Sequence, residues 1–207
     1  SKPFFSITPK NAGVNSSKKI NMVKNALIKN NVDYLLVTAP ENIAWVLNIR
    51  GYDSNFSPIP NSRLIINRDG NIKLFTNPKK VIKIKSIKRN TLNEKNIEKV
   101  LNSISNKRIW LDTLTCSIFY KNLLLKKNKI IEKIDPIYFL KSVKNKTEIK
   151  NIKKIHLIDG VALTKFLFWL KKNFKKNKIT EITAQKKLEN FRKKNTTYKY
   201  PSFNTIS

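Results

Sequence analysis

Apolar residues between positions 1 and 135 recur with two alternating spacings, which predict helices and strands in turn. Helical spacing is clear at Ile20, Val23 and Leu27, with Ser16 or Ser17 as the N-cap. Short, nearly continuous apolar runs indicate strands that are buried on both faces. We expect further helices from Pro40 and over residues 97–104 and 117–125, and strands over residues 33–38, 63–67, 72–75, 109–112 and 129–134. Interleaved helices and strands predict an α/β domain with a mostly buried mixed sheet.

The middle of the chain carries two strand signals of different kinds. Asp69-Gly70 lies between two apolar runs and predicts a β-hairpin with a type I′ turn, in which both central residues have positive φ. Lysine and isoleucine alternate over residues 79–89. This alternation predicts an edge strand whose outward lysines discourage further strand pairing.

A long helix is predicted after residue 145, with Asn145 or Thr147 as its cap. His156 and Asp159 lie on its apolar side at i, i+3 spacing, so we expect them to form a buried polar pair. Gly160 costs helix stability relative to alanine, which indicates a close approach of another element there. The apolar arc consists of Ile149, Ile152, Ile155, Leu163, Phe166, Leu167 and Leu170.

Two more elements are predicted toward the last residue. A helix begins at Thr180 and buries Ala184, Leu188 and Phe191, and residues 202–206 have the pattern of a strand. A single strand with nothing to pair is an unfinished sheet. The chain also begins at Ser1 rather than at a methionine. We therefore expect an internal piece of a longer protein.

The formal net charge of +30 suggests nucleic acid as a partner, but the composition argues against specific recognition. Only six of the basic residues are arginine, the side chain that reads phosphates and bases in two-point contacts. Lysine, asparagine and isoleucine are abundant along the whole chain, as an A/T-rich coding sequence would produce. We therefore predict a solvated lysine surface and no specific nucleic-acid partner.

The cysteine count, the N-terminal residues and the length of the apolar stretches bear on the cellular compartment. The single cysteine, Cys116, excludes an internal disulfide and fits a reducing environment, where we expect it to be a small residue near the core. The N-terminal residues lack the pattern of a signal peptide, and no apolar stretch reaches the ~20 residues of a membrane span. We predict a cytoplasmic protein with no membrane partner.

Three stretches of the sequence, in this order, have residue patterns that are typical of one known family. The first is Pro40-Glu-Asn-Ile-Ala-Trp-Val-Leu-Asn-Ile-Arg-Gly-Tyr-Asp53. The second runs from Leu140-Lys-Ser-Val-Lys-Asn-Lys-Thr-Glu-Ile149 through His156-Leu-Ile-Asp-Gly-Val-Ala-Leu163 to Phe166-Leu-Phe-Trp-Leu170. The third is Thr180-Glu-Ile182, Lys187-Leu-Glu-Asn-Phe-Arg192 and Ser202-Phe-Asn-Thr-Ile-Ser207. Together these stretches cover most of the chain, and in this order they resemble the Xaa-Pro aminopeptidase (aminopeptidase P) family.

The resemblance implies an architecture and an activity. Residues 1–143 resemble the creatinase-type N-terminal (middle) domain of the three-domain form, and residues 144–207 resemble the truncated start of the α+β pita-bread catalytic domain. The family removes the N-terminal residue from peptides with proline in second position. It uses two divalent metal ions, usually Mn²⁺, and the resemblance also suggests a homodimer.

The family's metal ligands, two Asp, one His and two Glu, follow the Ser-Phe-x-Thr-Ile-Ser strand on which this sequence ends. We therefore assign no catalytic residue and no metal ligand to this chain, and we predict that the chain alone is inactive. His156 is the only histidine, and one histidine cannot form a metal site by itself.

Arg50 and Asp53 are the candidate substrate-binding residues, because the resemblance places their loop at the rim of the substrate groove. Their spacing also allows an ordinary surface ion pair. Two other functions remain open: a non-catalytic pita-bread relative that binds proteins, and a basic domain that binds polyanions weakly. The order of metal ligands in the parent protein separates the first from the peptidase, and salt dependence of binding tests the second.

Overall fold

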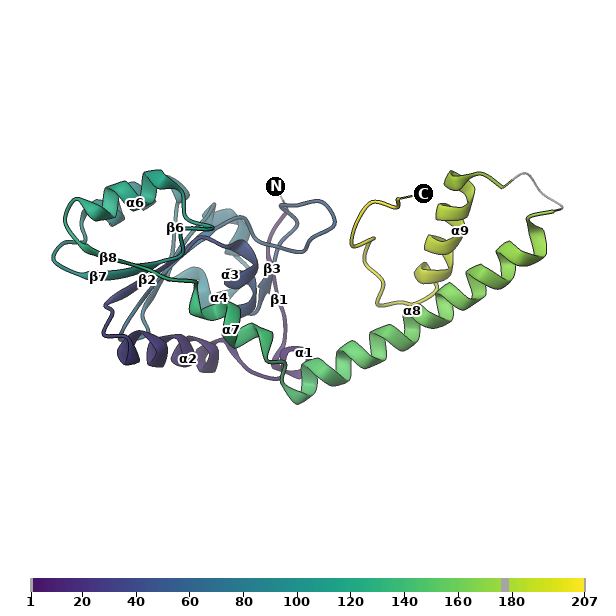
Figure 1. Ribbon diagram of the computed structural model, residues 1–207, viewed down its shortest axis with the longest axis horizontal. Helices are drawn as coiled ribbons and strands as arrows, with labels where there is room; N and C mark the ends of the chain where they lie inside the picture. Colours follow the sequence, from purple (N-terminus) through teal and green to yellow (C-terminus); the bar gives the residue numbers. More distant parts are fainter. Residues whose placement is uncertain (1, 176–178, 207) are drawn as a thin grey trace. The chain divides into compact units, whose positions relative to one another are not determined.

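The computed structural model describes residues 2–175 and 179–206 (Figure 1). The described residues form two compact units, which we describe separately. Of the described residues, the first unit contains 2–54 and 58–145, and the second contains 55–57, 146–175 and 179–206. The first unit holds the candidate site and most of the core.

Within the described residues, the first unit is built on a six-stranded sheet. Its strands are β2 (Tyr34–Val37), β4 (Arg63–Asn67), β5 (Ile72–Phe75), β6 (Thr91–Leu92), β7 (Arg108–Leu111) and β8 (Lys129–Glu132). Across the sheet their order is β6-β5-β4-β2-β7-β8. β4 is antiparallel to β2 and β5, whereas β2 with β7, β7 with β8, and β5 with β6 are parallel. The predicted α/β fold with a mixed sheet is confirmed.

Both faces of this sheet are buried because alternate residues of each strand point to opposite sides. In β2, Leu35 and Val37 join one apolar cluster and Leu36 joins the other. Figure 1 shows α2 on one side of the strands and α6 on the other. The first cluster includes residues of α2 (Ser16–Lys29), α3 (Pro40–Val46), α4 (Lys85–Lys88) and α7 (Pro136–Ser142), and the second those of α5 (Ile97–Asn102) and α6 (Ile118–Leu125).

A smaller ribbon joins the N-terminal segment to the chain after α3. It pairs β1 (Phe5–Ser6) with β3 (Ile49–Arg50) in antiparallel register. The shorter elements of this unit are α1 (Pro9–Ala12), the 3₁₀-helix η1 (Pro78–Val81) and the 3₁₀-helix η2 (Glu94–Asn96).

The predicted edge strand over residues 79–89 is wrong. This segment forms η1 and α4, and the short edge strand is β6. Val81, Ile84 and Ile87 are buried at a spacing of three, whereas Ile82 is 55% exposed. A strand would have turned Ile82 and Ile84 to the same face, so the core selects the helical spacing.

Asparagine side chains close two turns for which other residues were expected. Asn15, and not Ser16 or Ser17, caps α2 by accepting a hydrogen bond from the Lys18 amide at 2.8 Å. The hairpin between β4 and β5 is confirmed, but its turn is not type I′. Of Asp69 and Gly70, Gly70 alone has positive φ, 89°, and its amide donates to the Asn67 backbone carbonyl at 2.9 Å, so the central residues of this turn are Arg68 and Asp69. The side-chain oxygen of Asn67 accepts hydrogen bonds from the amides of Asp69 at 3.1 Å and Asn71 at 2.8 Å.

Helix α7, which the sequence patterns did not predict, is tied to α3 by a buried polar network. Asp135 caps α7, and its Oδ1 accepts a hydrogen bond from the Ile137 amide at 2.8 Å. Asn42 Nδ2 donates to Asp135 Oδ2 at 2.7 Å, and Lys141 Nζ donates to Asn42 Oδ1 at 2.5 Å. The Asp135 amide donates to Asp112 Oδ2 at 2.9 Å, so the network also reaches the end of β7.

Asp135 should make the stability of this unit depend on pH. Burial raises the pKa of its carboxyl from 3.8 to about 6. Because the folded state holds the proton more tightly, the stabilisation is complete below about pH 4 and is lost as the pH rises to about 6. We expect the free energy of unfolding to fall by about 3 kcal/mol across this window.

Urea unfolding of the wild type and of Asp135→Asn over this pH range measures the effect. The variant cannot titrate at this position, so the difference between the two stability curves should change across the window. A constant difference would contradict the assignment to Asp135.

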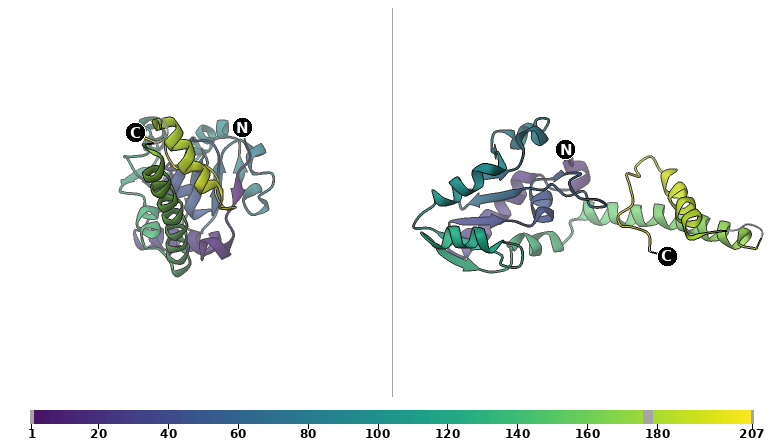
Figure 2. Two further views of the ribbon diagram at one scale, coloured as in Figure 1. Left: turned by 90° about the vertical axis from the view of Figure 1, so that its right-hand side faces the viewer. Right: turned by 90° about the horizontal axis from the view of Figure 1, so that it is seen from above.

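In the second unit, α9 (Glu181–Lys193) packs against α8 (Lys146–Asn173), and Figures 1 and 2 show α9 beside the distal part of α8. Thr180 caps α9 through a reciprocal capping box with Thr183. The predicted strand over residues 202–206 is not formed in the described part of the chain, where these residues are irregular and, as expected, have no strand to pair with. Ser207 lies outside the described residues.

The predicted buried pair of His156 and Asp159 is also wrong. His156 is exposed, and the Asp159 carboxylate binds Arg192 of α9 through two hydrogen bonds of 2.7 and 3.1 Å. No described atom outside the helix's own backbone would lie within 4 Å of a Cβ at Gly160, so the expected close approach is absent there. Most of the predicted apolar arc of α8 is exposed, and the residue of the helix that is buried, Ala162, is not part of that arc.

Candidate substrate-binding loop

The loop that carries Arg50 and Asp53 begins at a sharp change of direction after α3. Leu47 caps the helix, and Asn48 then adopts a left-handed conformation with φ of 52°. This turn sends the chain into β3, where Arg50 pairs with Phe5 of β1. The ribbon therefore fixes the backbone at Arg50.

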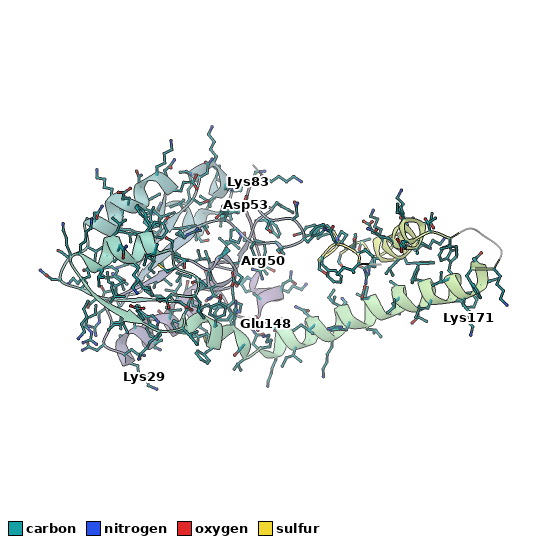
Figure 3. The ribbon with its side chains drawn as sticks, turned by 45° about the horizontal axis from the view of Figure 1, so that its top comes forward. Lys29, Arg50, Asp53, Lys83, Glu148 and Lys171 are labelled. Atoms are coloured by element: carbon teal, nitrogen blue, oxygen red, sulfur yellow. The ribbon has the colours of Figure 1, made fainter. Side chains whose placement is uncertain are left out.

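Arg50 is anchored at the C-terminal end of α3. Its Nη1 donates to the carbonyl oxygens of Ala44 at 2.9 Å and Ile49 at 2.8 Å. Carbonyls in the last turn of a helix have no partner within the helix and carry partial negative charge. The guanidinium therefore neutralises the end of α3 and is held near the start of the loop (Figure 3).

Asp53 closes the loop from the other side. Lys80 Nζ lies 2.6 Å from its Oδ1, and the Asn61 amide donates to its Oδ2 at 2.7 Å. The side chains of Asp53 and Lys80 are only 12% and 13% exposed. Asp53 thus pairs with Lys80 in place of the surface pair with Arg50 that the spacing allowed.

Between these anchors, Tyr52 is the aromatic residue of the loop. Tyr52 is 42% exposed, and the centre of its ring lies 5.3 Å from the centre of the Phe5 ring. Lys2 Nζ lies 5.4 Å from the centre of the Tyr52 ring. Sequence reasoning did not select Tyr52, although an aromatic residue between Gly51 and Asp53 in a loop was an available signal. The loop thus presents an aromatic surface beside Arg50.

The described residues do not supply the metal pair that the family resemblance implies. No group of three or more His, Cys, Asp or Glu side chains that could hold a metal ion occurs in residues 2–175 and 179–206. His156 is exposed, and the nearby Asp159 carboxylate is engaged by Arg192. These residues therefore do not fit a catalytic metal centre.

Cys116 has the properties of a structural residue. It packs against the apolar cluster on the α6 side of the sheet. Burial raises the pKa of its thiol to about 11, so the thiol stays protonated near neutral pH and is a poor nucleophile.

Positive side chains project from several parts of the surface, as Lys29 and Lys83 do on the first unit and Lys171 does on the second (Figure 3). In the described part of the chain, no helix is long and apolar enough to cross a membrane.

The sequence matches the family described as the creatinase/prolidase N-terminal domain over residues 1–148. It is 31% identical over 213 residues to Xaa-Pro aminopeptidase 1 of Dictyostelium discoideum, covering 98% of this chain and 34% of that protein. It is 33% identical over 208 residues to Xaa-Pro aminopeptidase ApepP of Drosophila melanogaster, covering 95% of this chain and 33% of that protein. The chain thus spans about a third of the length of these curated relatives.

Among solved structures, the X-prolyl aminopeptidase of Caenorhabditis elegans resembles this chain with a TM-score of 0.85 and 23% sequence identity. The likeness covers 99% of this chain and 35% of that protein, which is described as a cytosolic enzyme with a di-nuclear active site. A Xaa-Pro dipeptidase from Bacillus anthracis gives a TM-score of 0.63 at 15% identity, over 87% of this chain. At these identities the structural likeness bears on the fold.

Proposed function

Because the chain belongs to the creatinase/prolidase N-terminal domain family, we propose that its parent protein is a metal-dependent aminopeptidase that acts on peptides with proline in second position. The observation that carries the proposal is the identity of 31% and 33% with two Xaa-Pro aminopeptidases over nearly the whole chain. A similarity of this extent reaches past residue 148 into the second unit. The proposal therefore covers residues 144–207 as the start of a pita-bread catalytic domain.

The chemistry is assigned to the part of the parent protein outside this chain. Two divalent ions, which we propose to be Mn²⁺, would supply a water of lowered pKa as the nucleophile. No described residue of this chain is proposed as a ligand or as a catalytic group, so the chain alone should be inactive. We further propose a cytoplasmic homodimer as the working form.

The contribution of this chain is proposed to be substrate binding by the loop of Arg50 and Asp53. A guanidinium carries several N–H donors that suit the carbonyl oxygens of a peptide, and Tyr52 offers an apolar face beside it. Asp53 keeps the loop in place through Lys80 and Asn61. The loop would thus form part of the groove rim without taking part in bond cleavage.

The test compares the full-length protein, supplied with Mn²⁺, on peptides that differ only in proline or alanine at the second position. We expect cleavage of the proline peptide and no turnover by the 207-residue chain under the same conditions. In the full-length protein, Arg50→Ala should raise KM about tenfold and leave kcat within about twofold, because the residue binds substrate and does not react.

Arg68→Ala is the matched control, since the side chain of Arg68 is partly exposed and forms a loose ion pair of 3.7 Å with Asp33. Equal KM values for Arg50→Ala and Arg68→Ala would contradict the proposal that the loop binds substrate. Equal cleavage of the two peptides, or turnover by the 207-residue chain, would overturn the proposed function or the assignment of chemistry to the rest of the parent protein.

A further inference from the structure

A fully buried lysine lies beneath the turn that leads into the candidate loop. Lys19 of α2 is 1% exposed. Its Nζ donates to Asn48 Oδ1 at 2.7 Å and to the Trp45 carbonyl oxygen at 3.0 Å. The same atom lies 4.1 Å from the centre of the Trp45 ring. The charge of Lys19 is therefore directed at the last turn of α3 and the residue that follows it.

Burying an ammonium group is costly, and this cost indicates a role for Lys19 beyond filling space. Removing a charge from water costs several kcal/mol, and well-packed apolar residues of similar volume often replace buried charges with no loss of stability. A methionine would fill a similar volume on the face that Lys19 shares with Val23 and Leu27. Unlike methionine, lysine makes directional hydrogen bonds at this position.

Asn48, which accepts one of these two bonds, has a left-handed backbone conformation. Its φ of 52° lies in the left-handed region, which asparagine tolerates better than most residues. Its Nδ2 donates to the Val14 carbonyl at 2.8 Å, and its own carbonyl accepts from the Ile7 amide at 2.7 Å. With Lys19 on Oδ1, the side chain of Asn48 is held at both ends.

The segment on the other side of Asn48 is held as well. Asn145 Nδ2 donates to the Ala12 carbonyl at 2.8 Å. Between Ala12 and Val14, Gly13 has φ of 75°, and the side chain of Asn145 occupies the space that a Cβ would take there. The hydrogen bond from Asn145 and this close approach hold residues 12–14 next to the carbonyl that Asn48 binds.

From these contacts we propose that Lys19 is a positioning residue for the Arg50 loop. By holding Asn48 in its left-handed conformation, Lys19 sets the direction in which β3 leaves α3, and so the place at which Arg50 meets a peptide. The inference rests on the proposed function for its consequence in substrate binding. The positioning itself is a property of the first unit and can be measured without substrate.

The test uses Lys19→Met in the full-length protein, with Lys18→Met as the matched control because Lys18 is the exposed neighbour on the same helix. In Lys19→Met we expect amide hydrogen exchange of residues 48–53 to accelerate about tenfold, while the core strand over residues 34–37 exchanges at the wild-type rate. Unchanged exchange at residues 48–53, or equal acceleration at residues 34–37, would contradict a local positioning role.

The kinetic arm distinguishes positioning from general stability. Lys19→Met should raise KM about fivefold without changing kcat, and it should add little to the effect of Arg50→Ala in the double variant, because Lys19 acts through Arg50. Fully additive effects on KM would overturn the inference. If the wild type does not cleave the peptide at all, the proposed function fails, and the exchange experiment still decides the positioning role.

A second variant covers the case in which Lys19→Met does not fold. Asn48→Gly keeps a residue that tolerates positive φ but removes the side-chain bonds to Lys19 and Val14. It should show the same local exchange and the same rise in KM. Wild-type exchange and KM in Asn48→Gly would contradict the proposal.

Discussion

Replacing Gly51 with valine is expected to lower the free energy of unfolding by about 3 kcal/mol. A Cβ at this buried position would lie 2.8 Å from the Ile59 carbonyl oxygen, 2.9 Å from Pro60 Cα and 3.0 Å from Phe4 Cε1. Two of these contacts are with backbone, which cannot move aside as a flexible side chain would. The Gly51 amide also donates to the Pro58 carbonyl at 3.2 Å, so a shift to relieve the clash would break the closure of the loop.

Gly160→Ala is the control for the valine substitution. Its Cβ would meet no described atom outside the helix's own backbone within 4 Å, so the change should stabilise α8 by about 1 kcal/mol through helix propensity alone. Urea unfolding followed by tryptophan fluorescence measures both variants. Wild-type stability of Gly51→Val would show that the close approach at Gly51 does not exist.

The second large effect is expected for Asn42→Leu, with a loss of about 3 kcal/mol. Asn42 is fully buried and connects Asp135 to Lys141 through its two amide atoms. Leucine has a similar volume but removes both bonds, leaving a buried carboxyl and a partly buried ammonium without this shared partner. The loss should fall on the attachment of α7 to α3.

Asn25→Leu serves as the matched control, because Asn25 is exposed on α2 and its replacement should change stability by less than about 0.5 kcal/mol. Calorimetric melting of both variants near neutral pH gives the comparison. Equal melting temperatures for Asn42→Leu and Asn25→Leu would mean that the network contributes nothing.

The strands and helices that the sequence predicted correctly are those whose apolar spacing has one reading. The short apolar run over residues 33–38 predicts a buried strand, and Asp69-Gly70 between two apolar runs predicts a turn. The prediction of a strand over residues 79–89 was wrong because Ile82 and Ile84 fit a strand pattern in part. The residues that are buried in the core are Val81, Ile84 and Ile87, which have helical spacing. The prediction that His156 is buried was wrong because α9 packs against a part of the α8 surface that includes Asp159.

For the candidate site, sequence reasoning selected Arg50 and Asp53 but not the residues that hold them. Lys80 lies 27 residues from Asp53 and Ala44 is a backbone partner of Arg50, so neither contact has a local signal in the sequence. The burial of Lys19, in contrast, could have been predicted from the sequence. Lys19 stands in helical register with Val23 and Leu27, and a lysine in an apolar stripe indicates a buried, bonded charge.

The coding sequence downstream of Ser207 decides whether the parent protein is a metal-dependent peptidase. We expect two Asp, one His and two Glu to follow in that order within the same reading frame and to complete a metal site on the fold that we propose to begin in residues 144–207. A reading frame that continues without these residues would leave the creatinase-type domain in place and would contradict the peptidase.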